Sequence, residues 1–584
     1  MEPKKTLANH KKFGTKDVVF FLFFLVCIVI TWMKSRYGMA IVDEAFFLSL
    51  GDKIYRGNAM LVHEWHASQF TFFLIQPLFA LFHLFHQSNE GIVLFFRYAY
   101  VIVQAIVSVF MYFRLRKYSE TGAGISVIVY FLFCPLLQPN FNYNSIALMC
   151  LHITLILIFT SETKRNLQLA VAGFFFAGAV LCCPALIALY LLYSVVALYR
   201  KQGKEWFFFS SGCALLAAFF FVFLLSRASF SSLIENATHV LDDPEHPSFQ
   251  PFQILIYYFL SIWNMAPFAG PLYFLIIILS ILFGFSPELQ KKKNYLFVFS
   301  SLIVTVLIIE LIVQGTKSEI NSYPLNLIVF PINVLSPLCA ILYEEKLTRK
   351  ILTRIWIPGM LYSVCISFIS NLGIYSICSA ASLATTASIL IVTLTAEKHL
   401  FQEATLKKFA IVCVTFLFIC QIGGEIFLRL KSVYPGSDTS LSTEMIDWGC
   451  EKGIYVTSNQ KNGYESRLDY TSVIRNNPTS QKSAYISYHY WIVLEDWDVH
   501  SCTPSNLLTG LHKYSEDNPN TVVINRLEQY YQLNPERIPE AVYIDAGYDD
   551  IVNWYIDQFD YVIYSKEDRG TILLLHPKDY ISES

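Results

Sequence analysis

Apolar runs of helix length recur along the first 430 residues of the chain. They lie at about 18–34, 91–113, 124–138, 143–160, 167–182, 184–199, 206–226, 266–284, 295–313, 324–343, 353–371, 374–396 and 409–428. Hydrophobic residues make up 54% of the 584 positions and charged residues only 15%, which is more apolar surface than a soluble chain of this length can cover. A helix crosses a bilayer with roughly 20 apolar residues, so the pattern predicts a polytopic α-helical membrane protein with about thirteen transmembrane helices.

Basic loops predict how this bundle is oriented. The run from Val18 to Trp32 follows a lysine-rich flank and is at the long end for a signal-peptide core of roughly 7–15 residues, so we expect a retained helix with a cytoplasmic N-terminus. The position of the stretch 69–86 decides on which side of the membrane the later loops lie. If it lies in the outer interface, the basic loops all face the cytoplasm, as the positive-inside rule requires; if it spans, they all face outward. These loops are Arg114 to Lys117, Lys164-Arg165, Arg200-Lys201, Lys291 to Lys293, Lys346 to Lys350 and Lys407-Lys408. We therefore expect an odd number of spans and an extracytoplasmic C-terminus.

The composition becomes polar after about residue 431. Short β-rich runs follow at 453–457, 484–488, 521–524, 541–544, 561–564 and 571–575, and apolar residues between 551 and 559 recur at helical spacing. We expect residues 1–430 to form the transmembrane domain, with its first external loop at 35–90, and residues 431–584 to form a soluble extracytoplasmic α/β domain. Cys450 and Cys502 belong to that domain, and the sequence leaves open whether they pair in a disulfide.

The first external loop carries an acidic pair beside the membrane. After Asp43 and Glu44, apolar residues at 47, 50 and 54 recur at helical spacing, which predicts an amphipathic helix in the membrane interface. Glycosyl transfer from a lipid-linked donor requires a carboxylate that takes the acceptor's proton and cations near the departing phosphate. Asp43 would supply the first, and Lys53 and Arg56 the second. The alternative is that Asp43 caps the helix and Glu44 favours its positive end.

Further polar positions extend the candidate substrate site. Glu64 and His66 precede the next apolar stretch, and the spacing of the histidines around them differs from the His-Glu-x-x-His zinc motif. We expect no cofactor, although a divalent metal stays open. Asn142 and Tyr143 would bind sugar hydroxyls or simply form a turn. Lys317 would reach the donor phosphate or anchor a helix end in the headgroups.

At these positions the chain resembles the GT-C superfamily of polytopic glycosyltransferases, in the branch of the protein O-mannosyltransferases and the lipid A aminoarabinose transferases. The resemblance covers roughly residues 15–230. It is carried by Asp43-Glu44, Tyr55-Arg56-Gly57-Asn58, Glu64-Trp65-His66, Arg97 and Arg114 to Lys117. Asp43 matches the catalytic acidic position of the family, Glu44 its second acidic residue, and His66 the histidine of a Pro-rich element. Family members often have His-Pro-Pro where this chain has His66-Ala67-Ser68.

The resemblance implies transfer with inversion from a polyprenyl-phosphate sugar, with Asp43 as general base or acceptor-orienting group. We therefore expect a membrane glycosyltransferase of the hexosyl or pentosyl type, which acts on a cell-envelope glycan, lipid or protein outside the cytoplasm. The alternatives are a transporter or flippase of lipid-linked sugars, and an envelope sensor. The 43 basic and 45 acidic residues nearly balance, which argues against a nucleic-acid partner. Lysine content and short loops favour a bacterial plasma membrane.

Overall fold

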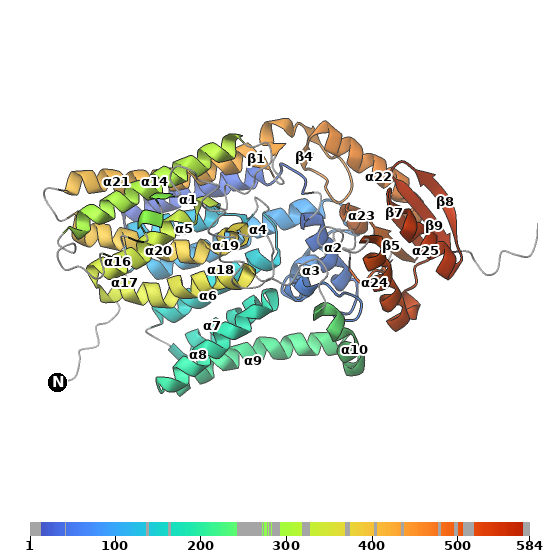
Figure 1. Ribbon diagram of the computed structural model, residues 1–584, viewed down its shortest axis with the longest axis horizontal. Helices are drawn as coiled ribbons and strands as arrows, with labels where there is room; N and C mark the ends of the chain where they lie inside the picture. The colour runs from blue at the N-terminus through green and yellow to red at the C-terminus, as the bar shows by residue number, and fades with distance from the viewer. Residues whose placement is uncertain are drawn as a thin grey trace, which may run out of the picture.

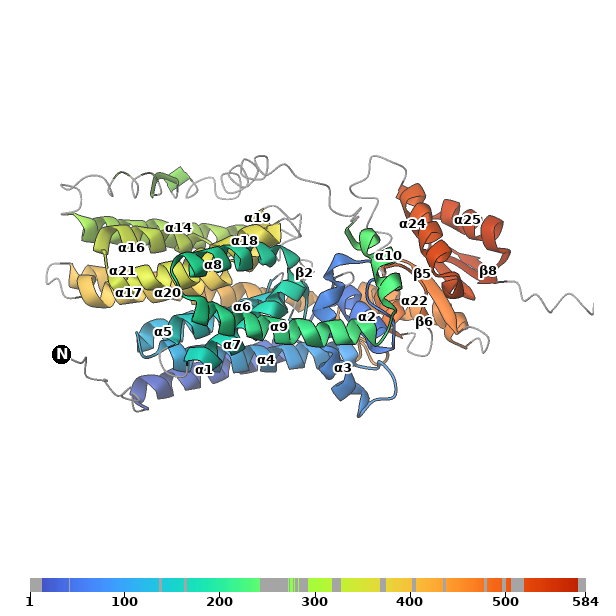
Figure 2. The same cartoon turned by 90° about the horizontal axis from the view of Figure 1, so that it is seen from below.

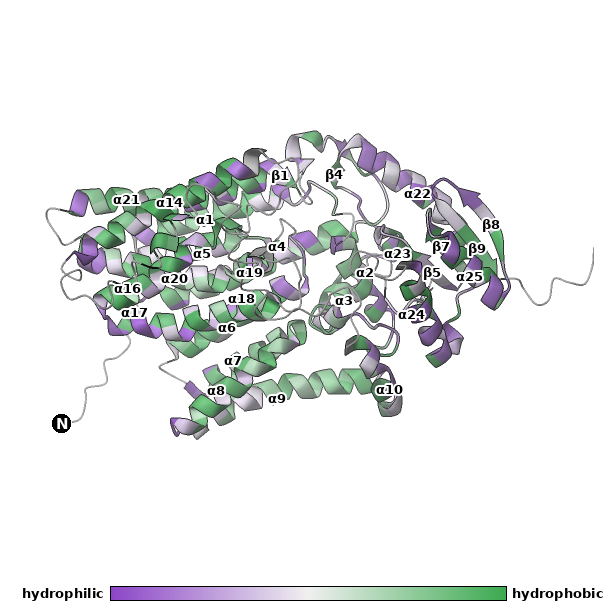
Figure 3. Ribbon diagram, viewed as in Figure 1, coloured by the Kyte–Doolittle hydropathy of each residue, from purple (hydrophilic) through white to green (hydrophobic). Residues whose placement is uncertain are grey.

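The chain forms a helical bundle joined to a smaller soluble domain, with a short helical layer between them (Figure 1). This computed structural model describes residues 13–40, 43–135, 139–161, 165–241, 271–272, 274–276, 278, 282, 292–317, 327–367, 374–401, 406–433, 437–476, 481–495, 500–505 and 519–575. Hydropathic colouring separates the apolar bundle from the polar helices of the soluble domain (Figure 3). The predicted combination of a helical membrane body and a C-terminal α/β domain is confirmed.

Within the described part of the chain, 7 helices are long and apolar enough to cross a membrane. They are α1 (Thr15–Lys34), α4 (Ile92–Leu115), α6 (Tyr143–Thr160), α7 (Arg165–Cys182), α9 (Gly203–Leu225), α14 (Lys293–Lys317) and α21 (Lys407–Lys431). Shorter bundle helices are α5 (Glu120–Leu132), α8 (Ile187–Tyr199), α16 (Leu335–Tyr343), α17 (Lys346–Ile351), α18 (Ile357–Ser367), α19 (Ile374–Ala380) and α20 (Ser382–Thr395). The run expected at 266–284 lies largely outside the described residues, so the count of about thirteen spans stays a prediction.

Several predicted spans are broken rather than continuous. The run at 324–343 contains a 3-10 turn at Pro331–Val334 before α16, and the run at 374–396 divides into α19 and α20. Helix α20 is buried along its whole length. Its apolar sequence therefore reflects a position inside the bundle as much as contact with lipid.

The first loop folds into α2 (Asp43–Tyr55), a 3-10 segment (Ala67–Phe73) and α3 (Gln76–His83). Helix α3 has 8 residues, too few to cross a bilayer. The prediction that α2 lies amphipathically at a surface is wrong, because α2 is buried from Glu44 through Ile54. Helix α3 packs on one side of it and α23 (Trp491–Glu495) of the soluble domain on another, so its polar side chains face protein.

The soluble domain is built on a five-stranded sheet of order β6-β5-β7-β9-β8. The strands are β5 (Lys482–Ile486), β6 (His500–Ser501), β7 (Ala541–Asp545), β8 (Tyr561–Glu567) and β9 (Gly570–Leu575). Strand β5 runs parallel to β6 and β7, whereas β9 is antiparallel to both β7 and β8. Helices α22 (Ser458–Asn476), α24 (Pro519–Leu533) and α25 (Asp549–Phe559) complete the domain, and α25 was predicted.

One predicted strand is instead a helix. Residues 521–524 are β-branched and were expected to be extended, but they lie in α24. Val523, Leu527, Tyr530 and Tyr531 recur at helical spacing and are all buried in one apolar cluster with the sheet. Burial of this face outweighs the local β preference of the valines.

The soluble domain is tied to the bundle through a hairpin of β3 (Glu444–Met445) and β4 (Tyr455–Val456). The backbone of Tyr455 exchanges hydrogen bonds with the chain just after α1, at 2.7 and 2.8 Å. The hairpin turn accepts hydrogen bonds from Gly91 and Val93 at the start of α4. The C-terminal domain thus holds the ends of the helices that flank the first loop. Cys450 and Cys502 are buried free thiols and do not form the disulfide considered above.

Candidate functional site

The two carboxylates of the acidic pair have different environments. Glu44 is 1% exposed, and both of its oxygens accept hydrogen bonds from Arg97 of α4, with Nε 2.8 Å from Oε1 and Nη2 on Oε2. Arg97 also donates to the carbonyls of Ser35 and Gly38, at 2.9 and 2.8 Å. Asp43, the first residue of α2, keeps partial exposure. Arg97 therefore fixes the start of α2 through Glu44 and leaves the neighbouring carboxylate nearer to solvent.

A third carboxyl group, absent from the sequence-based prediction, lies beside this pair. Glu451 of the β3–β4 turn is fully buried, and neither of its oxygens has a hydrogen-bond partner among the described residues. Burial, together with the nearby Glu44 and despite Arg97, raises the pKa of Glu451 to about 8. No local motif marks Glu451, because only the docking of the soluble domain brings it to α4.

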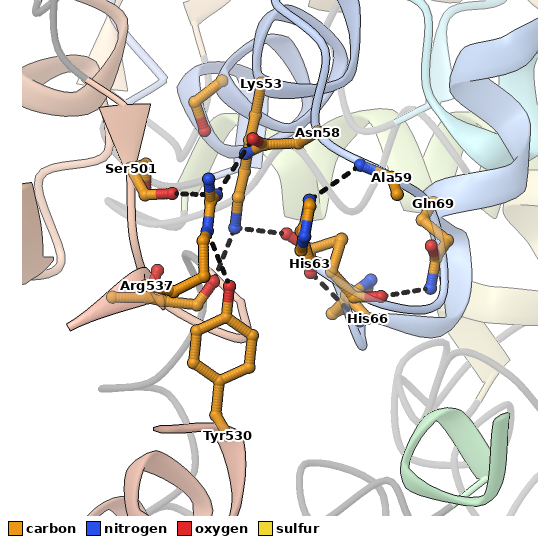
Figure 4. Close-up of polar contacts among 12 residues, drawn as sticks. Lys53, Asn58, Ala59, His63, His66, Gln69, Ser501, Tyr530 and Arg537 are labelled. Atoms are coloured by element: carbon orange, nitrogen blue, oxygen red, sulfur yellow. Dashed lines mark hydrogen bonds and ion pairs between the residues drawn. The ribbon is translucent and has the colours of Figure 1, made fainter. Parts of the chain in front are cut away.

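Lys53 lies in the interface between the first loop and the soluble domain (Figure 4). Its Nζ lies 3.1 Å from Glu64 Oε2 and donates to the Thr503 carbonyl at 2.6 Å. Lys53 and Glu64 are 1% and 0% exposed. Burial lowers the pKa of Lys53, and the neighbouring Glu64 carboxylate opposes that shift. On the soluble-domain side, Arg537 donates to Asn58 Oδ1 at 2.9 Å.

Arg56, the second predicted phosphate ligand, is also engaged. Its Nη2 lies 2.6 Å from Asp52 Oδ2 across one helical turn, and the Asp52 side chain is fully buried. Burial raises the pKa of Asp52, and the Arg56 charge counters this effect. In the structure as it stands, Lys53 and Arg56 neutralise buried carboxylates, and their role in phosphate binding stays a prediction.

The segment around His66 is enclosed by several parts of the chain. The Trp65 indole stacks on His239 of α10 (Phe230–Leu241), with ring centroids 4.3 Å apart, and Arg526 of α24 lies over its ring. Figure 2 shows α10 beside the soluble domain. His66 Nδ1 lies 2.7 Å from the Ser68 hydroxyl. Burial lowers the pKa of His63 to about 3, which keeps its ring neutral, and Nδ1 accepts from the Ala59 amide.

The structure brings some predicted residues together and leaves others apart. Phe46 of α2 contacts the rings of His66 and Tyr490, and Phe47 contacts Tyr143, so these side chains surround the first turns of α2. Asn142 caps α6 by accepting from the Ser145 amide at 2.8 Å, which accounts for it as a structural residue.

Lys317 is the last residue of α14, and its side chain lies outside the described part of the structure. Its predicted contact with the donor phosphate therefore stays a prediction.

No family model and no curated protein matches this chain. Among solved structures, the chain is similar to ArnT from Cupriavidus metallidurans in the apo state, with 12% identity, a TM-score of 0.40, and coverage of 95% of this chain and 97% of that one. It is also similar to ArnT from the same organism bound to undecaprenyl phosphate, with 12% identity, a TM-score of 0.44, and coverage of 96% and 98%.

Proposed function

We propose that this protein is a membrane glycosyltransferase that moves a sugar from a polyprenyl-phosphate donor to a cell-envelope acceptor. The proposal rests on the different burial of the two carboxylates in the acidic pair. Glu44 is buried and held by Arg97, whereas Asp43 stands partly exposed at the same helix start, where the bundle meets the soluble domain. An acceptor approaching from the aqueous side meets the bundle at this junction.

In this proposal, Asp43 accepts the proton of the acceptor hydroxyl as that oxygen attacks the anomeric carbon, and the sugar–phosphate bond breaks. Glu44 and Arg97 are positioning residues, because they hold the first turn of α2 and do not face solvent. His66 and Tyr143 lie near the same turn through Phe46 and Phe47 and would line the sugar site. The polyprenyl phosphate would leave as the acceptor oxygen attacks the opposite face of the anomeric carbon, so this single displacement would give a product of inverted configuration.

One observation favours transport of a lipid-linked sugar as the second candidate. Glu425 lies fully buried within α21, where its Oε1 accepts from Gln421 at 2.8 Å and its Oε2 has no hydrogen-bond partner among the described residues. Ionisable groups buried in a span often mark a transport pathway. A transporter, however, has no need of a carboxylate pair fixed at the domain junction.

The test compares the wild type with Asp43→Asn on mixed polyprenyl-phosphate sugars and envelope acceptors, with transfer followed by mass spectrometry. Asparagine preserves a helix-start residue of the same size but accepts no proton, so we expect a loss of about 10²–10⁴-fold in turnover. Asp469→Asn is the matched control, because this carboxylate is exposed on α22 and should leave turnover unchanged. Equal turnover by Asp43→Asn and the wild type would refute the catalytic assignment. Movement of the lipid-linked sugar across vesicles without transfer would favour the transporter.

A further inference from the structure

The turn of the β3–β4 hairpin places a buried carboxyl group beside the start of α4. The Val93 amide of α4 donates to the Cys450 carbonyl of this turn at 3.2 Å. Glu451 follows directly and is fully buried, and neither of its carboxyl oxygens has a hydrogen-bond partner among the described residues. Arg97 lies one helical turn beyond Val93, on the same face of α4. Docking of the soluble domain therefore brings the Glu451 carboxyl near Arg97, whose charge acts on it.

Arg97 has donor capacity left for a second carboxylate. A guanidinium group carries five N–H groups. Nε and Nη2 donate to Glu44, Nη2 also donates to the Gly38 carbonyl, and Nη1 donates to the Ser35 carbonyl. One N–H of Nη1 has no acceptor in the part of the chain that the structure describes. Glu44 and Glu451 thus share one guanidinium as their nearest cation, and Glu44 alone is bound to it.

The titratable groups that surround the Glu451 carboxyl from other elements are Glu44 of α2, Arg97 of α4, Tyr464 of α22 and Glu495 of α23. Glu495 accepts from the Cys450 amide at 2.7 Å, and the Tyr464 hydroxyl accepts from the Glu451 amide at 3.4 Å. On the turn itself, the Cys450 thiol donates to a carbonyl of α23 at 3.6 Å, and Lys452 forms its ion pair at the surface. Arg97 is therefore the cation for which an ionised Glu451 would compete.

The charge on Glu451 decides how Arg97 is shared. Burial, together with Glu44 and Glu495 and against Arg97, raises the pKa of Glu451 to about 8, so this carboxyl is neutral at pH 7. Arg97 then serves Glu44 alone and fixes the first turn of α2. Once Glu451 ionises, two buried carboxylates compete for one guanidinium, and the charge-assisted hydrogen bonds to Glu44 weaken.

We propose that Glu451 is a positioning residue for Asp43: its protonated form docks the hairpin on α4 without drawing Arg97 from Glu44, and its ionisation loosens the first turn of α2. This inference rests on the proposed function, in which Asp43 accepts the proton of the acceptor. It deepens that function by giving the soluble domain a part in sugar transfer, because Glu451 reaches α4 only when that domain is docked. The Glu451 carboxyl then sets the alkaline limit of the activity.

The first experiment measures turnover of the full-length protein against pH, with polyprenyl-phosphate sugars and envelope acceptors. In the wild type, one ionisation near pH 8 leaves about one tenth of the protein in the active form at pH 9, so turnover should fall about tenfold from its value at pH 7. Glu451→Gln is neutral at every pH and should stay within about twofold of its own value at pH 7. A residue that merely fills space would leave the pH profile unchanged on this substitution.

Two further variants isolate the charge. Glu451→Met keeps the length of the side chain without its hydrogen-bonding groups, and it should show the same flat profile because neither oxygen of Glu451 has a partner among the described residues. Glu444→Gln is the matched control, since this carboxylate is exposed on the same hairpin and should keep the alkaline fall of the wild type.

The second experiment does not depend on sugar transfer. Hydrogen exchange, expressed as protection factors that correct for the intrinsic effect of pH, is followed in a peptide that covers residues 43–50. We expect protection to fall between pH 7 and pH 9 in the wild type and to stay constant in Glu451→Gln. The Val93 amide, which donates to the Cys450 carbonyl, reports in parallel whether the hairpin stays docked.

The outcomes separate this role from the proposed function. The same alkaline fall in Glu451→Gln, Glu451→Met and the wild type would overturn the positioning role, as would loss of protection at Val93 while residues 43–50 stay protected. Protection that falls with pH only in proteins that carry Glu451, beside a wild type that transfers no sugar, would support the positioning of α2 and count against the enzyme. An active wild type and an inactive Asp43→Asn, without any alkaline fall due to Glu451, would support the enzyme and overturn the positioning role.

Discussion

Replacing Lys53 with methionine should loosen the soluble domain from the first loop. Methionine keeps the length and apolar stem of the side chain but removes the ammonium group that faces Glu64 Oε2 at 3.1 Å. Glu64 is then a buried carboxylate whose main remaining donor is the His66 amide at 3.0 Å. Breaking a buried ion pair on one side typically costs about 3–5 kcal/mol. We expect the upper half of that range, because the Thr503 carbonyl also loses its donor at 2.6 Å.

Hydrogen exchange at the domain interface measures this loss directly. The Trp65 amide donates to the Pro504 carbonyl at 2.7 Å and reports whether the two parts stay docked. A loss of about 4–5 kcal/mol corresponds to exchange faster by about 10³–10⁴-fold, at roughly 1.4 kcal/mol per factor of ten. The double variant Lys53→Met with Glu64→Gln removes both charges and should recover most of the protection. Protection within tenfold of wild type in Lys53→Met, or a double variant no better than the single one, would refute this reasoning.

Three further changes probe other parts of the structure. Because burial holds a proton on Glu451 up to about pH 8, against an ordinary value of 4.5, its stabilising contribution is complete below pH 4.5 and disappears as the pH rises through 8. Glu451→Gln should therefore flatten the melting temperature against pH across this window, and an unchanged slope would contradict the assignment. Trp65→Ala removes a side chain that is 1% exposed and should cost about 3–5 kcal/mol in unfolding free energy; a cost below 1 kcal/mol would show that the surroundings collapse onto the site. Gly212→Ala should lower thermal stability because its Cβ would lie 1.8 Å from the Ala170 carbonyl oxygen across α7 and α9, whereas Gly203→Ala in the same helix meets nothing; equal melting temperatures would indicate that the two helices separate freely.

The sequence predicted the helical body and the polar C-terminal domain because both depend on local composition. A long apolar run in a bilayer satisfies its backbone hydrogen bonds within the segment, so it folds as a helix wherever its neighbours lie. The β-branched and aromatic residues at 541–544, 561–564 and 571–575 equally predicted the strands found there. The strand expected at 521–524 failed because its valines pack on a core supplied by distant residues.

The acidic pair was visible in the sequence, but the roles of its two residues were not. Asp43 and Glu44 are chemically alike and adjacent. The contact of Glu44 with Arg97, 53 residues further along the chain, distinguishes the buried Glu44 from the partly exposed Asp43. Likewise, the charge of Lys53 was evident, whereas its burial depends on the docking of α3 and the soluble domain on α2.

By itself, the sequence determined the apolar helices of the bundle and where acidic and basic groups enter the chain, since these follow from short-range preferences and transfer free energies. The tertiary structure alone decided which charges are neutralised and which carboxyl group keeps its proton. Those properties depend on desolvation and on partners from remote parts of the chain, and no local pattern records either of them.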